Sequence, residues 1–89
     1  MLNLPAVVTH DHALGTARDL NAQAGLQAGG IVIDASALTH FDSSALAVML
    51  ACSREAAALG KTFAVHGMPA KLAQLAVLYG VAELIPAAA

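Results

Sequence analysis

The side chains that could carry out chemistry in this chain gather around Asp42-Ser43-Ser44, close to His40. A serine that gives its proton to a nearby histidine becomes a nucleophile, and His40 or His66 could be the base that activates Ser43. The chain lacks a nucleophile-elbow motif and an evident set of oxyanion donors, which disfavours this interpretation. We therefore predict no catalytic residue.

Metal and cofactor sites have equally little support. His10 and His12 flank Asp11, but two histidines at this spacing without a cysteine cluster are a weak indication of a metal site. Gly29-Gly30 precedes a strand-like run, whereas a phosphate-binding loop follows a strand. Cys52, the single cysteine, lies among apolar residues at helical spacing and is expected to be a packed thiol. The sequence thus predicts no bound metal, no cofactor and no hydrolysis of ATP or GTP.

Composition argues against nucleic acid and against a membrane span. Four Lys/Arg against six Asp/Glu give a net charge of −2, and aromatic residues make up only 3% of the chain, so phosphate neutralisation and base stacking are both disfavoured. Hydrophobic residues reach 58%, but the longest uninterrupted apolar run, 45–52, is far shorter than the ~18 residues a membrane span requires. No secretory signal is visible at the N-terminus, and a single cysteine suits a reducing compartment. We expect a cytoplasmic protein that reaches a membrane only through a partner.

The strand-like segments predict one α/β domain over residues 1–89. Short runs rich in β-branched and apolar residues predict strands at 2–9, 31–33 and 62–65, and Pro5 should break the first of these at a sheet edge or bulge. The uninterrupted run 31–33 is expected to be buried on both faces of the sheet. Strands that alternate with helices predict a mainly parallel sheet with helices packed on it.

Apolar periodicity predicts the helices, and a glycine follows each of them. Asp11 is expected to cap the first helix. Residues 81–85 should form a final short strand or a packed tail, followed by a low-complexity end at 87–89. The predicted helices run from Ala13 to Gly29-Gly30, over 43–59 before Gly60, and from Pro69 to Gly80.

The helix predicted over 43–59 has two distinct faces. The line Ser43, Ala47, Leu50 and Arg54 carries small and apolar residues with a single charge, whereas a solvated face is normally charged. Such a face is suited to cover by a protein partner. Leu50 could equally be one exposed leucine without a role, and periodicity leaves both interpretations open. The opposite stripe, expected to face the sheet, consists of Ala45, Val48, Met49, Cys52, Ala56 and Leu59.

The central part of the chain resembles the signature of STAS domains, the bacterial anti-sigma-factor antagonists and their relatives. That family has a buried strand ending in Asp, a short loop, and then Asp-Ser/Thr-Ser/Gly-Gly-Leu at the opening of a helix, which 31–36 and 41–46 resemble. The stretch 60–67 is similar to the next helix stop and strand, and 75–81 to the MlaB-like branch. The resemblance, over 2–86, implies a STAS fold: a mixed, mostly parallel sheet of four to five strands with helices packed on it.

The chain departs from the family pattern in two places. Ala45 stands where the family usually has glycine, so the turn into the helix has to accommodate a Cβ. The chain also resembles the family from the second strand of its opening hairpin onwards, which would shorten one sheet edge. Since exposed edges tend to pair with other chains, we expect weak homodimerisation at high concentration.

The resemblance implies a non-enzymatic, protein-binding role. In the MlaB-like branch the domain is the cytoplasmic STAS subunit of the ABC transporter that maintains outer-membrane lipid asymmetry, which implies a transporter ATPase as partner and a location peripheral to the inner membrane. The anti-sigma antagonists are phosphorylated at the position of Ser43, which implies the alternative, a phosphorylatable switch that binds an anti-sigma kinase. A helix N-terminus favours an anion there, although Ser43 or Asp42 could serve only as an N-cap. The expected partner-binding residues are Asp42, Ser43, Ser44, Ala47, Leu50 and Arg54.

Overall fold

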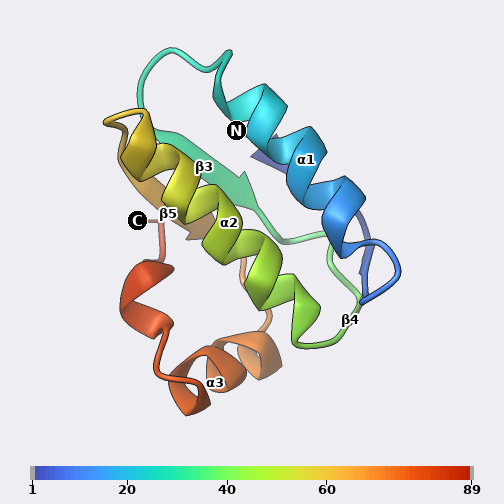
Figure 1. Cartoon of the computed structure of the whole chain (residues 1–89). Helices are drawn as coiled ribbons and strands as arrows, with labels where there is room; N and C mark the ends of the chain where they lie inside the picture. Colours follow the sequence, from blue (N-terminus) through green and yellow to red (C-terminus); the bar gives the residue numbers. More distant parts are fainter. Residues whose placement is uncertain (1, 89) are drawn as a thin grey trace.

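The computed structural model describes residues 2–88 (Figure 1). Met1 and Ala89, the two ends of the predicted domain, lie outside the described residues. In chain order the elements are β1 (Leu2–Asn3), β2 (Val7–Val8), α1 (Ala13–Ala24), β3 (Ile31–Asp34), β4 (His40–Phe41), α2 (Ser44–Ala58), β5 (Phe63–His66), α3 (Ala70–Leu78) and the 3-10 helix η1 (Ala82–Leu84). The predicted alternation of strands and helices is therefore present, with one additional short strand, β4.

The five strands form two small parallel sheets instead of the single sheet of four to five strands that we predicted. The larger sheet has the order β1-β3-β5, and β2 pairs with β4 in the smaller one. Every strand pair is parallel, so the expected mixture of directions is not seen among residues 2–88. The division arises at Pro5, which interrupts the first strand as predicted and separates β1 from β2.

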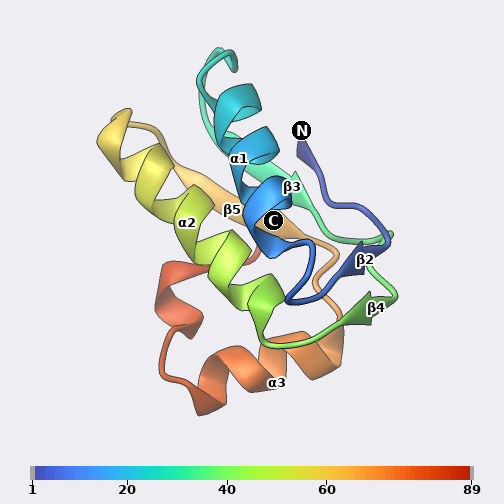
Figure 2. The same ribbon diagram turned by 45° about the vertical axis from the view of Figure 1, so that its right-hand side comes forward.

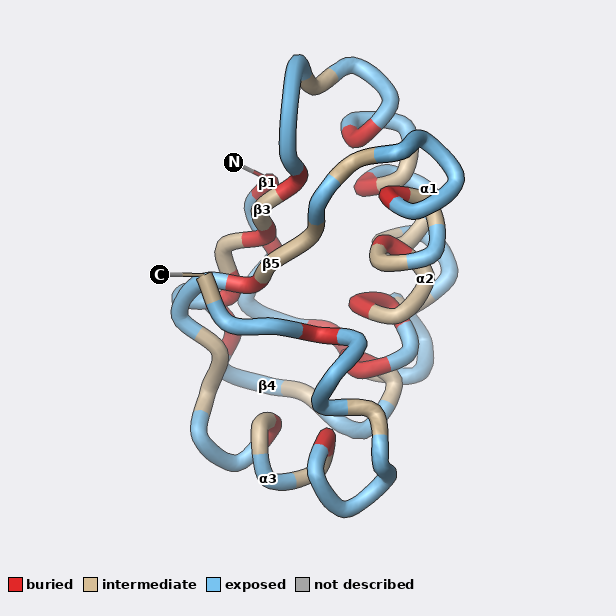
Figure 3. The backbone as a smooth tube through the Cα atoms, turned by 90° about the vertical axis from the view of Figure 1, so that its left-hand side faces the viewer, coloured by how far each residue is buried: buried red, intermediate tan, exposed pale blue. Residues whose placement is uncertain are grey.

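Helices α1 and α2 cover the same face of the larger sheet (Figure 3). The chain passes from β1 through α1 to β3 and then through α2 to β5, always towards the next neighbouring strand. Because such crossovers are right-handed, two successive ones in the same direction place both helices on one side. Ile31 and Ile33 point to that side and are buried, whereas Val32 is only half-buried. The prediction that this strand is buried on both faces is therefore wrong.

The helix ends follow the glycine positions in two of three cases. At Gly60 (φ +69°) the amide of Lys61 donates to the Ala56 carbonyl, and at Gly80 (φ +71°) the amide of Val81 donates to the Ala76 carbonyl. Both are Schellman-type ends, in which a left-handed residue closes the helix. The first helix differs, because α1 already ends at Ala24 and not at Gly29-Gly30.

Two further predictions about chain ends need correction or refinement. Asp11 does not cap α1, since the N-cap residue is His12 and no side chain bonds to the first turn. Residues 82–84 form η1 and not a strand, but Ile85 is buried and the following chain returns to the sheet. There the amide of Val65 donates to the Pro86 carbonyl and the amide of Ala88 to the Val65 carbonyl, each at 2.9 Å. The tail thus extends the sheet beside β5.

The core lies between the larger sheet and the α1–α2 layer, and α3 closes one end (Figure 3). Helix α2 contributes more buried residues than any other element: Ala45, Leu46, Val48, Met49, Cys52 and Ala56. This set contains five of the six residues predicted to face the sheet; Leu59 is 42% exposed. Within residues 2–88, no helix combines the length and apolar character needed to cross a membrane.

Candidate docking face at the start of helix α2

The Asp42 carboxylate organises the start of helix α2. Its Oδ1 accepts a hydrogen bond from the backbone amide of Ser44 at 2.8 Å, which caps the first turn of the helix. Its Oδ2 accepts from the amide of His10 at 3.1 Å. One side chain thus ties the loop that leads into α1 to the beginning of α2. Strands β2 and β4 lie side by side next to this junction (Figure 2).

The electrostatics at this end are set by the same contacts. The Ser44 amide, and after it the His10 amide, hold the pKa of the Asp42 carboxyl below its ordinary value of 3.8. The side chain is exposed and carries its negative charge at the positive end of the helix. The amide of Ser44 is therefore already occupied by an anion. The helix N-terminus that we predicted to favour a phosphate on Ser43 is partly satisfied by Asp42.

Ser43 itself is the N-cap residue by position, but its hydroxyl makes no capping hydrogen bond. Its carbonyl accepts from the amides of Leu46 at 3.1 Å and Ala47 at 3.4 Å, and the second of these is the first α-helical bond, as expected for an N-cap residue. Since Asp42 supplies the capping oxygen, the exposed Ser43 hydroxyl is not needed to cap the helix. That leaves it accessible to a partner or an enzyme.

The predicted docking residues differ in how far they reach the surface. Asp42, Ser43, Ala47 and Arg54 are exposed, and Ser44 is half-buried. Leu50 is also half-buried and packs against the core cluster. The sequence interpretation placed Leu50 in the middle of an exposed line, and this needs correction because its side chain packs against the buried core cluster.

Helix α1, which packs beside α2, adds residues to this face that the sequence interpretation did not include. Ala13, Leu14 and Ala17 of α1 line a shallow hollow of about 270 Å³ with Ala47 and Val48 of α2. Leu14 is 65% exposed beside it. The signal was present in the sequence as an apolar residue outside the buried stripe of the first helix. What it adjoins depends on the side-by-side packing of α1 and α2 (Figure 1).

Two alternatives involved histidines: a histidine that activates Ser43, and a metal site. No hydrogen bond among residues 2–88 joins the Ser43 hydroxyl to His40 or His66; the His40 ring lies 3.2 Å from the Thr39 hydroxyl instead. His12 likewise pairs with the hydroxyl of Thr9 at 3.1 Å. In the described part of the chain, His, Cys, Asp and Glu form no group of three or more that could hold a metal ion. The rings of His12 and His40 thus pair with threonine hydroxyls in the part of the chain that the structure describes.

The carboxylate at the end of β3 has a local structural role. Asp34 Oδ1 accepts from the Ser36 hydroxyl at 2.6 Å and from the Ser36 amide at 2.9 Å, which lowers the pKa of Asp34. Gly67 (φ +69°) packs against this turn, because a Cβ there would lie 2.9 Å from Ser36 Cβ. The Asp-Ala-Ser turn thus fixes the path of the chain from the sheet towards β4 and α2.

Two comparisons with known proteins complete this description. A search of curated proteins finds no match to the chain. A scan of protein families matches residues 1–86 to the family described as "Mlab, STAS domain". The match spans nearly all of the chain, including the Asp-Ala-Ser turn and the capped start of α2. Together with the parallel α/β architecture, it shows that this chain belongs to the STAS domain family.

Proposed function

We propose that this STAS domain is the protein-binding subunit of a phospholipid-transporting ABC complex that maintains outer-membrane lipid asymmetry. It docks on the transporter ATPase through the start of α2 and thereby regulates or stabilises it. The observation that carries this proposal is the exposed line Ser43, Ala47 and Arg54, which presents two small side chains and a single charge where a solvated helix face would be mostly charged. The family description, which names the Mlab branch, supports the choice of partner.

The composition of this face favours protein contact. Small residues allow another backbone to approach closely, and the α1–α2 hollow beside Ala47 offers room for an apolar side chain. Asp42 and Arg54 place opposite charges at the two ends of the line, which would fix the orientation of a partner more than its affinity. Interfaces of this kind have an apolar centre and a polar rim.

A second candidate function is that of an anti-sigma factor antagonist, a switch that binds an anti-sigma kinase through the same face. The exposed Ser43 hydroxyl, which makes no capping bond, favours it. A phosphate on Ser43 would add a charge of roughly −1.5 to −2 next to the Asp42 carboxylate. Repulsion between the two anions would change the helix start and so release a partner.

The test compares two identical substitutions, one inside and one outside the proposed interface. Ala47→Glu places a carboxylate in the interface, and Ala22→Glu places one on an exposed position in the last turn of α1, away from the line Ser43, Ala47 and Arg54. Both should fold, because surface changes usually alter stability by less than about 0.5 kcal/mol. Ala47→Glu and Ser43→Glu should weaken binding of the purified ATPase at least about tenfold, as expected for a charge buried unpaired. Ala22→Glu should bind like the wild type.

Thermal melting of the same variants separates binding from folding. Met49 is fully buried in α2, so Met49→Asp should unfold the domain and provides the reference for complete loss of folding. Leu50→Asp should lose about 1–2 kcal/mol, because Leu50 packs on the core, and is therefore a poorer probe than Ala47. Normal ATPase binding by a folded Ala47→Glu variant would place the interface elsewhere. Binding of a purified anti-sigma kinase in place of the ATPase, lost in Ser43→Glu, would favour the second function.

A further inference from the structure

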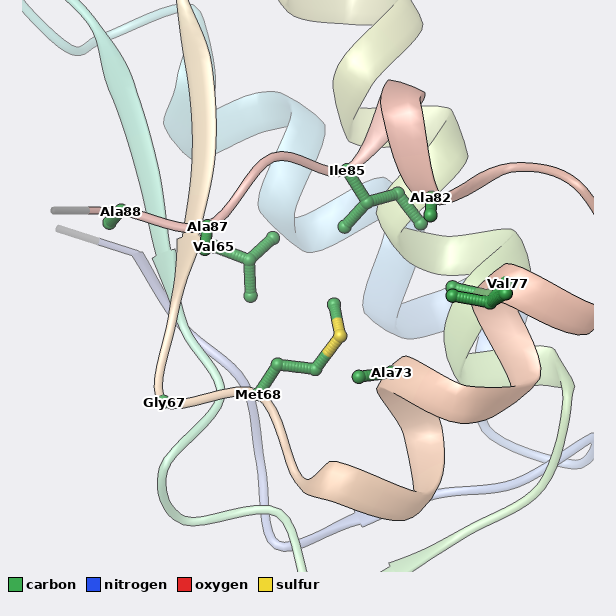
Figure 4. A pocket seen from close by; sticks show the side chains of 10 residues that line it. Val65, Gly67, Met68, Ala73, Val77, Ala82, Ile85, Ala87 and Ala88 are labelled. Carbon is green, nitrogen blue, oxygen red and sulfur yellow. The ribbon is translucent and has the colours of Figure 1, made fainter.

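A cavity of about 410 Å³ lies outside the residues of the candidate docking face. It is bordered by the end of β5, helix α3, η1 and the returning tail (Figure 4). No residue of α1 or α2 lines it, so it is separate from the proposed ATPase interface. The lining residues include Val65, Met68, Ala73, Val77 and Ile85.

The lining has a uniform chemical character. All ten residues that line the cavity are Ala, Val, Ile, Met or Gly, and none carries a charged or hydrogen-bonding side chain. A charged or strongly polar ligand would lose its hydration there without compensation, at a cost of several kcal/mol as an order of magnitude. The cavity is therefore complementary to an uncharged hydrocarbon group and to little else.

The side chains converge on one space. In Figure 4 those of Val65, Ile85 and Met68 extend into the gap between the tail and α3, and Val77 faces it from the helix. Val65 and Ile85 are buried, Met68 is half-buried, and Val77 is 69% exposed at the mouth. Methionine is flexible and polarisable, so Met68 can adjust to an occupant. The result is a fixed apolar floor with an adaptable wall and an open entrance.

The volume also fits a ligand site. Apolar cavities of about 150 Å³ stay dry and take up benzene in a well-studied protein, and small-molecule sites generally span about 300–1,000 Å³. We propose that this cavity binds a small uncharged molecule through its hydrocarbon body, an aromatic ring or a short alkyl chain. Binding removes apolar surface from water on both sides and involves no polar recognition.

The experiment uses benzene and n-hexane as probes of the full chain. In ¹H–¹⁵N correlation spectra of the labelled protein, the probes should shift amides around the cavity, including Met68 and Val77, and leave those around Ser43 in place. Saturation with benzene should also raise the melting temperature, since a ligand bound only by the folded state stabilises it.

A matched pair of variants tests the location. Ala73→Leu fills the cavity and should abolish the benzene shifts, while Ala22→Leu, on an exposed position of α1, should bind like the wild type. If Ala73→Leu fails to fold, Val77→Glu at the exposed mouth should weaken binding instead, because it brings a carboxylate to an apolar entrance. Absence of shifts up to aqueous saturation, or unchanged binding by the filled variant, overturns the proposal. The proposal is also overturned if raising the protein concentration slows translational diffusion and shifts the same amides, because this surface would then contact another chain.

Discussion

The two ends of the α1–α2 layer are held by one charged side chain each, but in different ways. At the end where both helices begin, the Asp42 carboxylate accepts the amides of His10 and Ser44. At the end where both stop, the Lys61 ammonium donates to the carbonyls of Ala24, at 3.2 Å, and Gln27. Asp42 is exposed, whereas Lys61 and its bonds are partly buried.

The signs of these two charges suit the dipoles of the two packed helices. Because α1 and α2 both return from the sheet in the same direction, they lie parallel, with their positive ends together and their negative ends together (Figure 1). An anion at the first end and a cation at the second offset the repulsion between the aligned dipoles. We call the partly buried Lys61 contacts the cationic clamp and the exposed Asp42 contacts the anionic clamp. The comparison indicates that similar contacts hold both ends of the layer, and that under the proposed function only the exposed end would also form part of a binding surface.

Removing the cationic clamp should have the largest effect on this comparison. Lys61→Met keeps the length of the side chain but leaves the Ala24 and Gln27 carbonyls without their donor, and hydrogen bonds of charged groups are worth about 1.5–3 kcal/mol. We expect a loss of about 2 kcal/mol in the free energy of unfolding, measured by urea denaturation. Lys71→Met, an exposed lysine of α3, is the matched control and should change little. Equal effects of the two variants would contradict the clamp.

Removing the anionic clamp should cost less and should depend on pH. The folded state lowers the pKa of Asp42 through the Ser44 and His10 amides, so this contribution is present above the unfolded pKa of about 3.9 and is lost as pH falls through the folded value. Asp42→Asn should therefore be less stable than the wild type at pH 7, by less than Lys61→Met. The difference should shrink on acidification, as measured by melting temperature from pH 7 to pH 2.

Asp34 provides the internal check on that pH dependence. Its pKa is also lowered, first by the Ser36 hydroxyl and then by the Ser36 amide, so part of the acid sensitivity should persist in Asp42→Asn. The double variant with Asp34→Asn should lose most of what remains. A difference between Asp42→Asn and wild type that stays constant down to pH 2 would argue against the Asp42 carboxylate as the titrating group.

The smallest predicted difference between the two clamps is in how much their removal changes the reactivity of Cys52, which lies on α2 between the two ends. Burial, and then Glu55, raises the pKa of this thiol to about 11, so alkylation by iodoacetamide at pH 8 should be at least about a hundredfold slower in the folded protein than in urea. Lys61→Met should speed the reaction more than Asp42→Asn, since it destabilises the layer more. Equal acceleration by both variants would show that the two ends contribute equally.

The exposure of most residues of the candidate docking face could be predicted from their spacing, but the partial burial of Leu50 could not. Ser43, Ala47 and Arg54 are exposed as a helical projection requires, and the Asp42 cap follows from residue type. Leu50 lies on the same line and yet packs on the core, a contact that residue spacing along one helix does not reveal. The sequence shows Leu14 as an apolar residue outside the buried stripe of the first helix, but the hollow beside it depends on the packing of α1 against α2, which no local pattern predicts.

The sequence by itself determined the order of the three helices among the strands β1, β3 and β5, the parallel βαβ connections and the glycine stops at Gly60 and Gly80, because periodicity and left-handed backbone preferences act locally. It also determined the family, through motifs that can be read along the chain. Only the tertiary structure decided that both helices cover one face, that the strands split into two sheets, and that Lys61 reaches the end of α1. These features depend on crossover handedness and on contacts between residues more than thirty positions apart, such as Lys61 with Ala24 and His10 with Asp42, for which a local pattern carries no information.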